Sequence, residues 1–255
     1  MAYFKLKDVH LEIPVFTARS RGLLNTLLMV TRSEKKRLQR TGLFSANVHA
    51  LKGISLEICD GERVGLLGLN GSGKTTLLKV LSGAYEPTSG SIISNGSIGS
   101  LTDLMIGMDP EATGYENVRM KNSQMGGAKR DLDELYEDVK QFTGLGEYLD
   151  LPIRTYSSGM VLRLAVALST TRTSEILLMD EMIGVGDMHF VQKTEERIQK
   201  IMSSSAILVL ASHSDGILRR FCSRGIVLNE GTVVYDGAID SAIRFYSESP
   251  SQEIR

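Results

Sequence analysis

Apolar and polar residues alternate at the start of the chain, which is the pattern of a strand with one buried face. Residues 4–13 place Phe4, Leu6, Val9, Leu11 and Ile13 among charged or polar neighbours. This period of two predicts a β-strand. Shorter runs at residues 53–58 and 90–94 predict two more strands, which we group with the first in an antiparallel β-subdomain.

The spacing of apolar residues becomes helical from about residue 112 to 146. Thr113 is followed three residues later by Glu116, which is the pattern of a helix capping box. Leu132, Leu135, Val139 and Phe142 then recur at helical intervals and predict a helix over residues 131–143. We expect a helical lobe over about residues 112–160.

Strands and helices alternate in the remaining sequence. The predicted strands are residues 63–67, 175–181 and 206–210, followed by a hairpin over 224–235. The predicted helices start near residues 76 and 159 and cover 188–203 and 238–247. A β-α-β rhythm of this kind favours an α/β fold with a parallel sheet.

A glycine-rich segment between the first of these strands and its helix fits the pattern G-x-x-x-x-G-K-[ST]. In this pattern the backbone N–H groups and the positive end of the helix face the phosphates of a nucleotide. Lys74 would reach the β- and γ-phosphates, and the Thr75 hydroxyl would hold Mg²⁺. The candidate nucleotide-binding residues are Gly68, Leu69, Asn70, Gly71, Ser72, Gly73, Lys74, Thr75 and Thr76.

A second candidate site for chemistry ends the apolar run at residues 175–181. Asp180 and Glu181 follow directly on Ile176 to Met179 and would be delivered at the carboxyl end of a buried strand, where α/β sheets bind ligands. Asp180 is then the candidate Mg²⁺ partner and Glu181 the candidate general base for an attacking water. The alternative is that both acids only end the strand.

Several further motifs occur in a characteristic order. They are Tyr156-Ser157-Ser158-Gly159-Met160, Arg163, the Asp180-Glu181 pair, Gly184-Val185-Gly186-Asp187, and His213 after Leu210-Ala211-Ser212. With the phosphate loop, they resemble the nucleotide-binding subunit of an ABC transporter over nearly the whole chain. The resemblance implies a P-loop NTPase fold, with a RecA-like parallel-sheet core, an antiparallel β-subdomain and a helical lobe.

The signature motif departs from the usual L-S-G-G-Q, because it reads Y-S-S-G-M here. Together with residues 113–118 and 185–190, this departure resembles the ATPases that export O-antigen, other lipid-linked polysaccharides or teichoic acids. Export of capsule or drugs remains an alternative. A soluble ABC ATPase acting on DNA or ribosomes would need a long coiled coil or paired cassettes, and the sequence contains neither.

The resemblance assigns roles to individual residues. It implies a homodimer in which Ser157, Ser158 and Gly159 of one copy bind the ATP held by the other. Asp187 would lie at the dimer seam, and His213 would hydrogen-bond the γ-phosphate and help place the water against Glu181. The alternative for His213 is a structural histidine at a strand end.

Two assignments within the resemblance are open. Asp103 would take the place of a glutamine that senses Mg²⁺ in many such subunits, or is an ordinary loop acid. Phe44 is the first candidate for stacking on adenine and His49 the second, with an exposed loop aromatic as the alternative.

Composition narrows the classes of partner. With 255 residues, 42% of them hydrophobic, the chain suits one large or two small lobes with a proper core, and the resemblance implies a single ABC domain over residues 1–255. A net charge of −1 argues against nucleic-acid binding. Cys59 and Cys222 lack metal-ligand spacing and favour a reducing compartment. Without an apolar run long enough to span a bilayer, we expect a separate transmembrane permease and a location on the cytoplasmic face of the membrane.

A basic insertion over about residues 14–47 does not belong to the general pattern. Its net charge is +6, so the rest of the chain carries −7. Leu23, Leu24, Leu27 and Leu28 share one face of a predicted helix, which would contact the membrane surface or the permease. A solvated basic loop is the alternative. At the other end, the sequence stops soon after the predicted hairpin, and we expect no carbohydrate-binding domain there.

Overall fold

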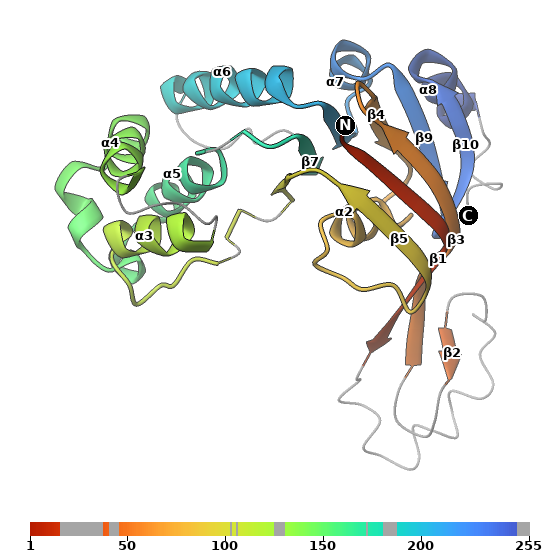
Figure 1. Cartoon of the computed structure of the whole chain (residues 1–255), viewed down its shortest axis with the longest axis horizontal. Coiled ribbons are helices and arrows are strands. Elements are labelled where there is room, and N and C mark those ends of the chain that lie inside the picture. The colour runs from red at the N-terminus through yellow and green to blue at the C-terminus, as the bar shows by residue number, and fades with distance from the viewer. Residues whose placement is uncertain are drawn as a thin grey trace. The chain divides into compact units, whose positions relative to one another are not determined.

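The computed structural model describes residues 1–15, 38–40, 46–102, 104–105, 107–124, 131–171, 173–180 and 188–248 (Figure 1). The chain divides into two compact units. The first contains Met1–Gly96 and Val209–Arg255, and the second contains Ser97–Leu208. No helix within the described ranges is long and apolar enough to cross a membrane.

An antiparallel sheet in the order β2-β3-β1-β5 forms one part of the first unit. Its long strands β1 (Tyr3–Val15), β3 (Ala46–Cys59) and β5 (Ser89–Asn95) run side by side in Figure 1. Each extends beyond the range expected from its apolar pattern. Phe4, Leu6 and Ile58 are buried, which confirms the alternation as the signal of a half-buried strand.

The short strand β2 (Leu38–Arg40) was not predicted. It pairs with β3, with Leu38 opposite Val48 and Arg40 opposite Ala46. The basic residues around it carry no apolar alternation, so its place in the sheet depends on tertiary pairing with β3. The expected helix at Leu23 to Leu28 lies outside the described residues.

The rest of the first unit is a mixed sheet with helices beside it. Four strands are hydrogen-bonded in the order β10-β9-β4-β8, with β4 parallel to β9 and β10 antiparallel to it. The strands are β4 (Arg63–Leu67), β8 (Ile207–Ala211), β9 (Arg224–Asn229) and β10 (Thr232–Ala238). The helices are α2 (Lys74–Leu81), α7 (Asp215–Phe221) and α8 (Ile239–Glu248). All were predicted to within a few residues except α7.

Helix α8 packs very closely against strand β9 at Gly225. A Cβ atom at Gly225 would lie 2.4 Å from the Cβ of Ala242, so any side chain there would push the helix away. Ile239, Ala242 and Ile243 are the buried residues of α8. The small residue in β9 therefore sets how closely the last helix packs.

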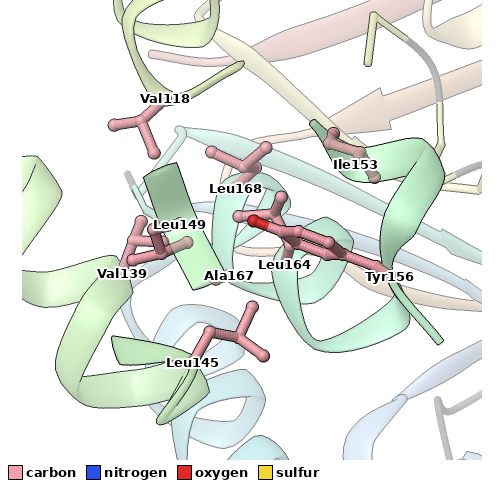
Figure 2. Close-up of a cluster of buried hydrophobic side chains, with 9 residues drawn as sticks. All are labelled: Val118, Val139, Leu145, Leu149, Ile153, Tyr156, Leu164, Ala167 and Leu168. Carbon is pink, nitrogen blue, oxygen red and sulfur yellow. The ribbon is translucent and has the colours of Figure 1, made fainter. Parts of the chain in front are cut away.

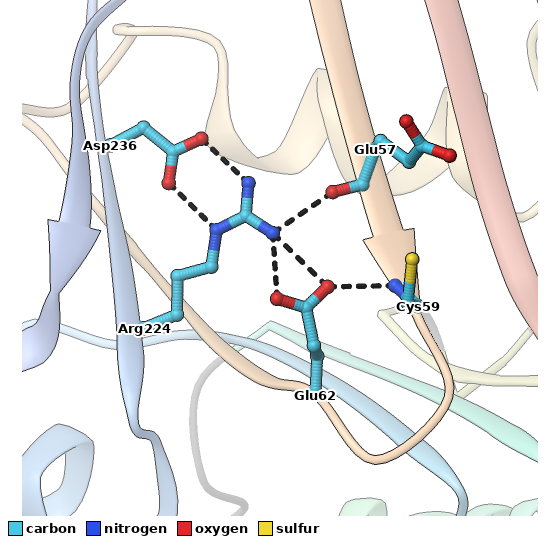
Figure 3. Close-up of polar contacts among 5 residues, drawn as sticks. All are labelled: Glu57, Cys59, Glu62, Arg224 and Asp236. Atoms are coloured by element: carbon cyan, nitrogen blue, oxygen red, sulfur yellow. Dashed lines mark hydrogen bonds and ion pairs between the residues drawn. The ribbon is translucent and has the colours of Figure 1, made fainter.

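Arg224 ties three strands of the first unit together (Figure 3). Its Nε and Nη2 donate to the two carboxylate oxygens of Asp236 on β10 at 2.7 and 2.6 Å. Its Nη1 donates to both carboxylate oxygens of Glu62, at 2.9 and 3.1 Å, and to the Glu57 carbonyl at 2.9 Å. Asp236 and Glu62 raise the pKa of the guanidinium above its usual value.

The second unit contains the two short strands β6 and β7 and is otherwise mostly helical. Strand β6 (Ile98–Leu101) is parallel to β7 (Ile176–Asp180). The helices are α3 (Gly114–Gln124), α4 (Asp131–Thr143), α5 (Ser158–Ser169) and α6 (Met188–Ser204). Two single turns of 3₁₀ helix, η3 (Gly146–Asp150) and η4 (Ile153–Thr155), precede α5.

The helices of the second unit enclose an apolar cluster of their own (Figure 2). Its members come from α3, α4, both 3₁₀ turns and α5, with Leu149 and Leu164 fully buried. The buried members are Val118, Val139, Leu145, Leu149, Ile153, Tyr156, Leu164, Ala167 and Leu168. Helices α3 and α4 and the two turns lie within the range expected for a helical lobe.

Replacing Arg224 with Lys tests the three-strand tie. Lysine keeps the charge but cannot form the two-pronged contact with Asp236, so we expect the free energy of unfolding to fall by about 2 kcal/mol. Arg219→Lys is the matched control, since its ion pair with Asp240 is exposed and should contribute less than about 0.5 kcal/mol. Urea unfolding of both variants measures the difference, and equal losses would contradict the assignment.

Candidate nucleotide-binding site

The glycine-rich loop joins β4 to α2, as its sequence context predicts. Gly68, Gly71 and Gly73 have positive φ angles of 145°, 78° and 112°. A Cβ atom at Gly68 would lie 2.4 Å from the Leu228 carbonyl oxygen. Only glycine fits at position 68, because the φ angle is unfavourable for other residues and because a side chain would collide with the Leu228 carbonyl.

Lys74 lies over this loop with its side chain buried. Its Nζ donates to the carbonyl oxygen of Gly68 at 2.6 Å and of Leu69 at 3.2 Å. Carbonyl oxygens compensate the desolvated ammonium without neutralising it. A charged phosphate oxygen would be a stronger partner for this ammonium than a carbonyl oxygen, and the contact of Lys74 with phosphate stays a prediction.

The loop is fastened to two other segments through Gly231. The Gly231 N–H donates to the Ser72 carbonyl at 2.8 Å, and the Gly231 carbonyl accepts from the Lys52 N–H at 2.8 Å. A Cβ atom at Gly231 would lie 2.5 Å from the Ala50 carbonyl oxygen. From sequence Gly231 was only a hairpin residue, and the structure adds a second role as the clamp on the phosphate loop.

Helix α2 begins at Lys74 with Gly73 as its N-cap and without a side-chain cap. Thr75 and Thr76 are the next residues of its first turn, with Thr75 exposed and Thr76 half-buried. An uncapped helix N-terminus behind a glycine loop is an anion-binding arrangement. Leu69 and Asn70, at the tip of the loop, are exposed.

His213 lies two residues after the end of β8, in the first unit. Its neighbours are fixed by hydrogen bonds: the Ser212 hydroxyl accepts from the Ser214 N–H at 3.1 Å, and Ser214 is the N-cap of α7. The His213 side chain is exposed. The tight turn thus presents the histidine at the carboxyl end of a buried strand, as the sequence predicted, and its contact with a phosphate stays a prediction.

Asp180 ends β7 in the second unit. The four residues before it are fully buried or nearly so, while Asp180 itself is half-buried. This is the arrangement expected for an acid delivered by a buried strand. Glu181 and Asp187, which follow it in sequence, lie outside the described residues, so their roles stay predictions.

The signature residues form the N-terminus of α5. Ser157 is the N-cap, and its hydroxyl accepts from the Met160 N–H at 3.3 Å. Ser157, Ser158 and Gly159 are all exposed, and a Cβ at Gly159 would meet nothing within 4 Å. Small side chains therefore leave this helix end accessible, and its positive dipole would favour an anion.

Tyr156, which precedes these residues, points the opposite way into the helical cluster (Figure 2). Its hydroxyl donates to the Tyr148 carbonyl at 2.5 Å. Burial raises the pKa of the Tyr156 hydroxyl to about 12, so it remains a donor at physiological pH. A Cβ at Gly114 would lie 2.7 Å from the same hydroxyl. The usual signature motif L-S-G-G-Q begins with leucine. Tyr156 at this position therefore adds a hydrogen bond that leucine could not form.

The segment 113–117 braces the chain just ahead of the signature. The capping box is confirmed, since the Thr113 N–H donates to Glu116 at 2.8 Å and the Glu116 N–H donates to the Thr113 hydroxyl at 3.1 Å. These bonds lower the pKa of Glu116. Thr113 also forms an isolated bridge with Pro152, four residues before Tyr156.

Asn117 is the centre of this brace, and from sequence it was noted only as one residue of the segment 113–118. It is 1% exposed. Its side-chain oxygen accepts from the Asp109 N–H at 2.8 Å, and its Nδ2 donates to the carbonyls of Asp109 at 3.0 Å and Thr113 at 2.9 Å. A single buried amide that forms hydrogen bonds with the backbone of a loop produces no periodic pattern in the sequence.

Two open assignments are not resolved by the fold. Asp103 and Phe44 lie outside the described residues, and their metal and adenine roles stay predictions. The second adenine candidate, His49, is on β3 directly opposite Glu12 of β1. Its Nε2 lies 3.5 Å from a Glu12 carboxylate oxygen.

Removing the Asn117 amide tests the brace. Asn117→Ala removes a buried side chain and leaves the Asp109 N–H and the carbonyls of Asp109 and Thr113 without this partner, so we expect the free energy of unfolding to fall by about 2 kcal/mol. Ser123→Ala, at an exposed position on the same helix, should change it by less than about 0.5 kcal/mol. Thermal unfolding of both variants measures this, and a tolerated Asn117→Ala would count against the brace.

Comparison with known proteins shows what this chain is similar to. A family model described as ABC transporter matches residues 51–184. The O-antigen export system ATP-binding protein RfbE of Yersinia enterocolitica is 38% identical over 92% of this chain and 97% of its own length. The teichoic acids export ATP-binding protein TagH of Listeria monocytogenes is 36% identical over 78% of this chain, but over only 59% of its own length.

A solved structure is similar in fold. It is the dimeric post-hydrolysis state of the ATP-binding cassette MJ0796 bound to ADP and Pi, with a TM-score of 0.64 and 21% identity. The match covers 92% of this chain and 98% of that one. This likeness confirms the predicted fold class of a P-loop cassette.

Proposed function

This chain belongs to the ABC transporter family, and on that premise we propose that it powers export of a lipid-linked polysaccharide of the O-antigen type. It is an ATPase of the ABC type. The observation that carries the ATPase activity is the glycine loop with buried Lys74 aimed into it. The cargo is inferred from the similarity to the O-antigen export protein of Yersinia.

ATP is bound by the family, and Mg²⁺ is part of our proposal. Thr75 at the start of α2 and Asp180 at the end of β7 offer a hydroxyl and a carboxylate, which are the oxygen ligands that Mg²⁺ prefers. Asp103 is a further candidate. When bound, the ion would offset charge on the β- and γ-phosphates.

The chain's own residues would carry out hydrolysis as follows. Lys74 and the loop N–H groups hold the phosphates, and Glu181 accepts a proton from the water that attacks the γ-phosphorus. His213 hydrogen-bonds the γ-phosphate and orients that water. The bond from the γ-phosphorus to the β–γ bridging oxygen breaks, giving ADP and inorganic phosphate.

A homodimer closing around ATP is the second part of the proposal. The exposed N-terminus of α5, with Ser157, Ser158 and Gly159, is a surface that could contact the γ-phosphate held by another copy. Asp187 would join the two sites at the seam. The dimeric arrangement of the similar cassette supports this geometry.

A separate polytopic permease would carry the cargo, with this subunit on the cytoplasmic face of the membrane. Closing and reopening of the ATPase dimer would be passed to two copies of that permease. Teichoic acid export is the second candidate function, because the Listeria relative is of similar identity. Both candidates use the same chemistry in this subunit.

The direct test of the mechanism is Glu181→Gln in the assembled complex. Loss of the base should lower ATP turnover by at least about a hundredfold while ATP stays bound. Lys74→Met is the matched comparison, because losing the ammonium should abolish ATP binding itself. Turnover and retained nucleotide are measured on the same preparations, and normal turnover in Glu181→Gln would show that the base is misassigned.

The cargo is tested by deleting the gene that encodes this subunit. We expect lipid-linked polysaccharide to accumulate on the cytoplasmic side, and wild-type protein but not Glu181→Gln to restore export. Mass spectrometry of extracted lipid carriers identifies the attached polymer. Accumulation of a polyol-phosphate polymer would favour teichoic acid, and no accumulation of any polymer would overturn the polysaccharide assignment.

A further inference from the structure

The residue just ahead of α5 is held at two points. The Tyr156 hydroxyl donates to the carbonyl of Tyr148, eight residues earlier in η3, at 2.5 Å. Its backbone N–H donates to the Ile153 carbonyl at 2.8 Å. Ser157, the next residue, is the N-cap of α5. Tyr156 is therefore fixed at its backbone and at the far end of its side chain, directly before the helix begins.

Glycine at position 114 leaves the space that this hydroxyl occupies. A Cβ atom there would lie 2.7 Å from the Tyr156 hydroxyl oxygen and 3.0 Å from the Cα of Leu149. The Gly114 N–H donates to the Leu151 carbonyl at 3.3 Å, so the start of α3 lies against the end of η3. The hydroxyl thus lies where α3 and η3 meet, close to backbone atoms of both.

Backbone hydrogen bonds tie the chain between η3 and α5 to the loop that precedes α3. The Ile153 N–H donates to the Ala112 carbonyl at 3.0 Å, and the Arg154 N–H donates to the Pro110 carbonyl at 2.9 Å. They hold residues 153 and 154. The Tyr156 hydroxyl extends this connection to the residue next to the N-cap of α5.

Apolar packing alone would not supply such a restraint. The Tyr156 ring belongs to the apolar cluster of the second unit, together with Leu149 and Leu164 (Figure 2). Burial of apolar surface is non-directional, whereas a hydrogen bond fixes the donor relative to its acceptor. The hydroxyl therefore adds a directional restraint that the ring, or a leucine in its place, does not provide.

We propose that Tyr156 is a positioning residue for the signature, acting through its hydroxyl. The exposed residues Ser157, Ser158 and Gly159 contact ATP only when two copies close on it, so any freedom that they keep in the monomer must be lost at that step. A hydroxyl that removes this freedom beforehand favours closure without touching the nucleotide. This inference rests on the proposed function, because the contact of the signature with ATP is part of that proposal.

The test is Tyr156→Phe in the Glu181→Gln chain, with ATP-dependent dimerisation followed by analytical ultracentrifugation. Phenylalanine keeps the ring in the cluster, and the Tyr148 carbonyl keeps its bond from the Leu151 N–H at 3.0 Å, so the second unit should stay folded. We expect the dissociation constant of the dimer to rise about tenfold, since each dimer contains two signatures.

ATP binding by the monomer gives a readout that separates positioning from general damage. The phosphate loop lies in the first unit, so the ATP affinity of monomeric Tyr156→Phe should equal that of its parent. It is measured by fluorescence titration at protein concentrations below those of dimerisation. Loss of monomer ATP affinity together with dimerisation would show general damage and overturn the proposal.

Tyr148→Phe in the same Glu181→Gln chain is the matched control. It removes a tyrosine hydroxyl from η3 but leaves the carbonyl acceptor in place, and Tyr148 is 56% exposed. Its dimerisation should stay within about twofold of the parent. Melting temperatures are measured for all variants, and dimerisation is compared well below them. Unchanged dimerisation in Tyr156→Phe, or an equal loss in Tyr148→Phe, would sink the positioning role.

The parent chain distinguishes this inference from the proposed function. If Glu181→Gln dimerises with ATP, the closing dimer is supported whatever the effect of Tyr156→Phe. An unchanged Tyr156→Phe then overturns the positioning role alone. A Glu181→Gln chain that stays monomeric with ATP bound would overturn both.

Discussion

Two backbone hydrogen bonds at Gly231 are the constraint on which the phosphate loop depends. One links Gly231 to Ser72 in the loop and the other links it to Lys52 on β3, so the turn between β9 and β10 connects the loop to a strand of the antiparallel sheet. A side chain at Gly231 or at Gly68 would collide with backbone carbonyls. Because these contacts are backbone to backbone, the loop is shaped before any phosphate arrives, and little ordering entropy remains to oppose binding.

Different interactions position the signature residues, which lie in the second unit. Its exposed residues are small and make few contacts, whereas Tyr156 just before them is anchored to Tyr148 and packed against Gly114. Asn117 fixes the loop that pairs with the same stretch of chain. Behind them, Arg163 of α5 lies over the ring of Phe190 on α6, and Arg197 of α6 lies over the ring of Phe142 on α4. An accessible helix N-terminus thus lies on a well-packed base, which suits the proposed contact with ATP held by another copy.

The sequence predicted most of the elements because their signals are local. The glycine loop, the acid at the end of β7 and the capping box at Thr113 each lie within a few residues, and each was found where expected. The clamp by Gly231 and the contact of Arg163 with Phe190 join residues far apart in the chain. Such contacts follow from tertiary packing and leave no periodic trace. Strand β2 was missed for the same reason, since it exists by pairing with β3.

The central claim is that ATP brings two copies of this chain together. It rests on membership of the ABC transporter family and on two proposed parts of the ATP site, the glycine loop and the exposed N-terminus of α5. The most direct measurement is the mass of the purified Glu181→Gln subunit in analytical ultracentrifugation, with and without ATP. The account predicts a change from the monomer mass of 28.0 kDa to twice that value on adding ATP, and no change when Ser157 is also replaced by Arg. A particle that keeps the monomer mass with ATP bound would contradict it.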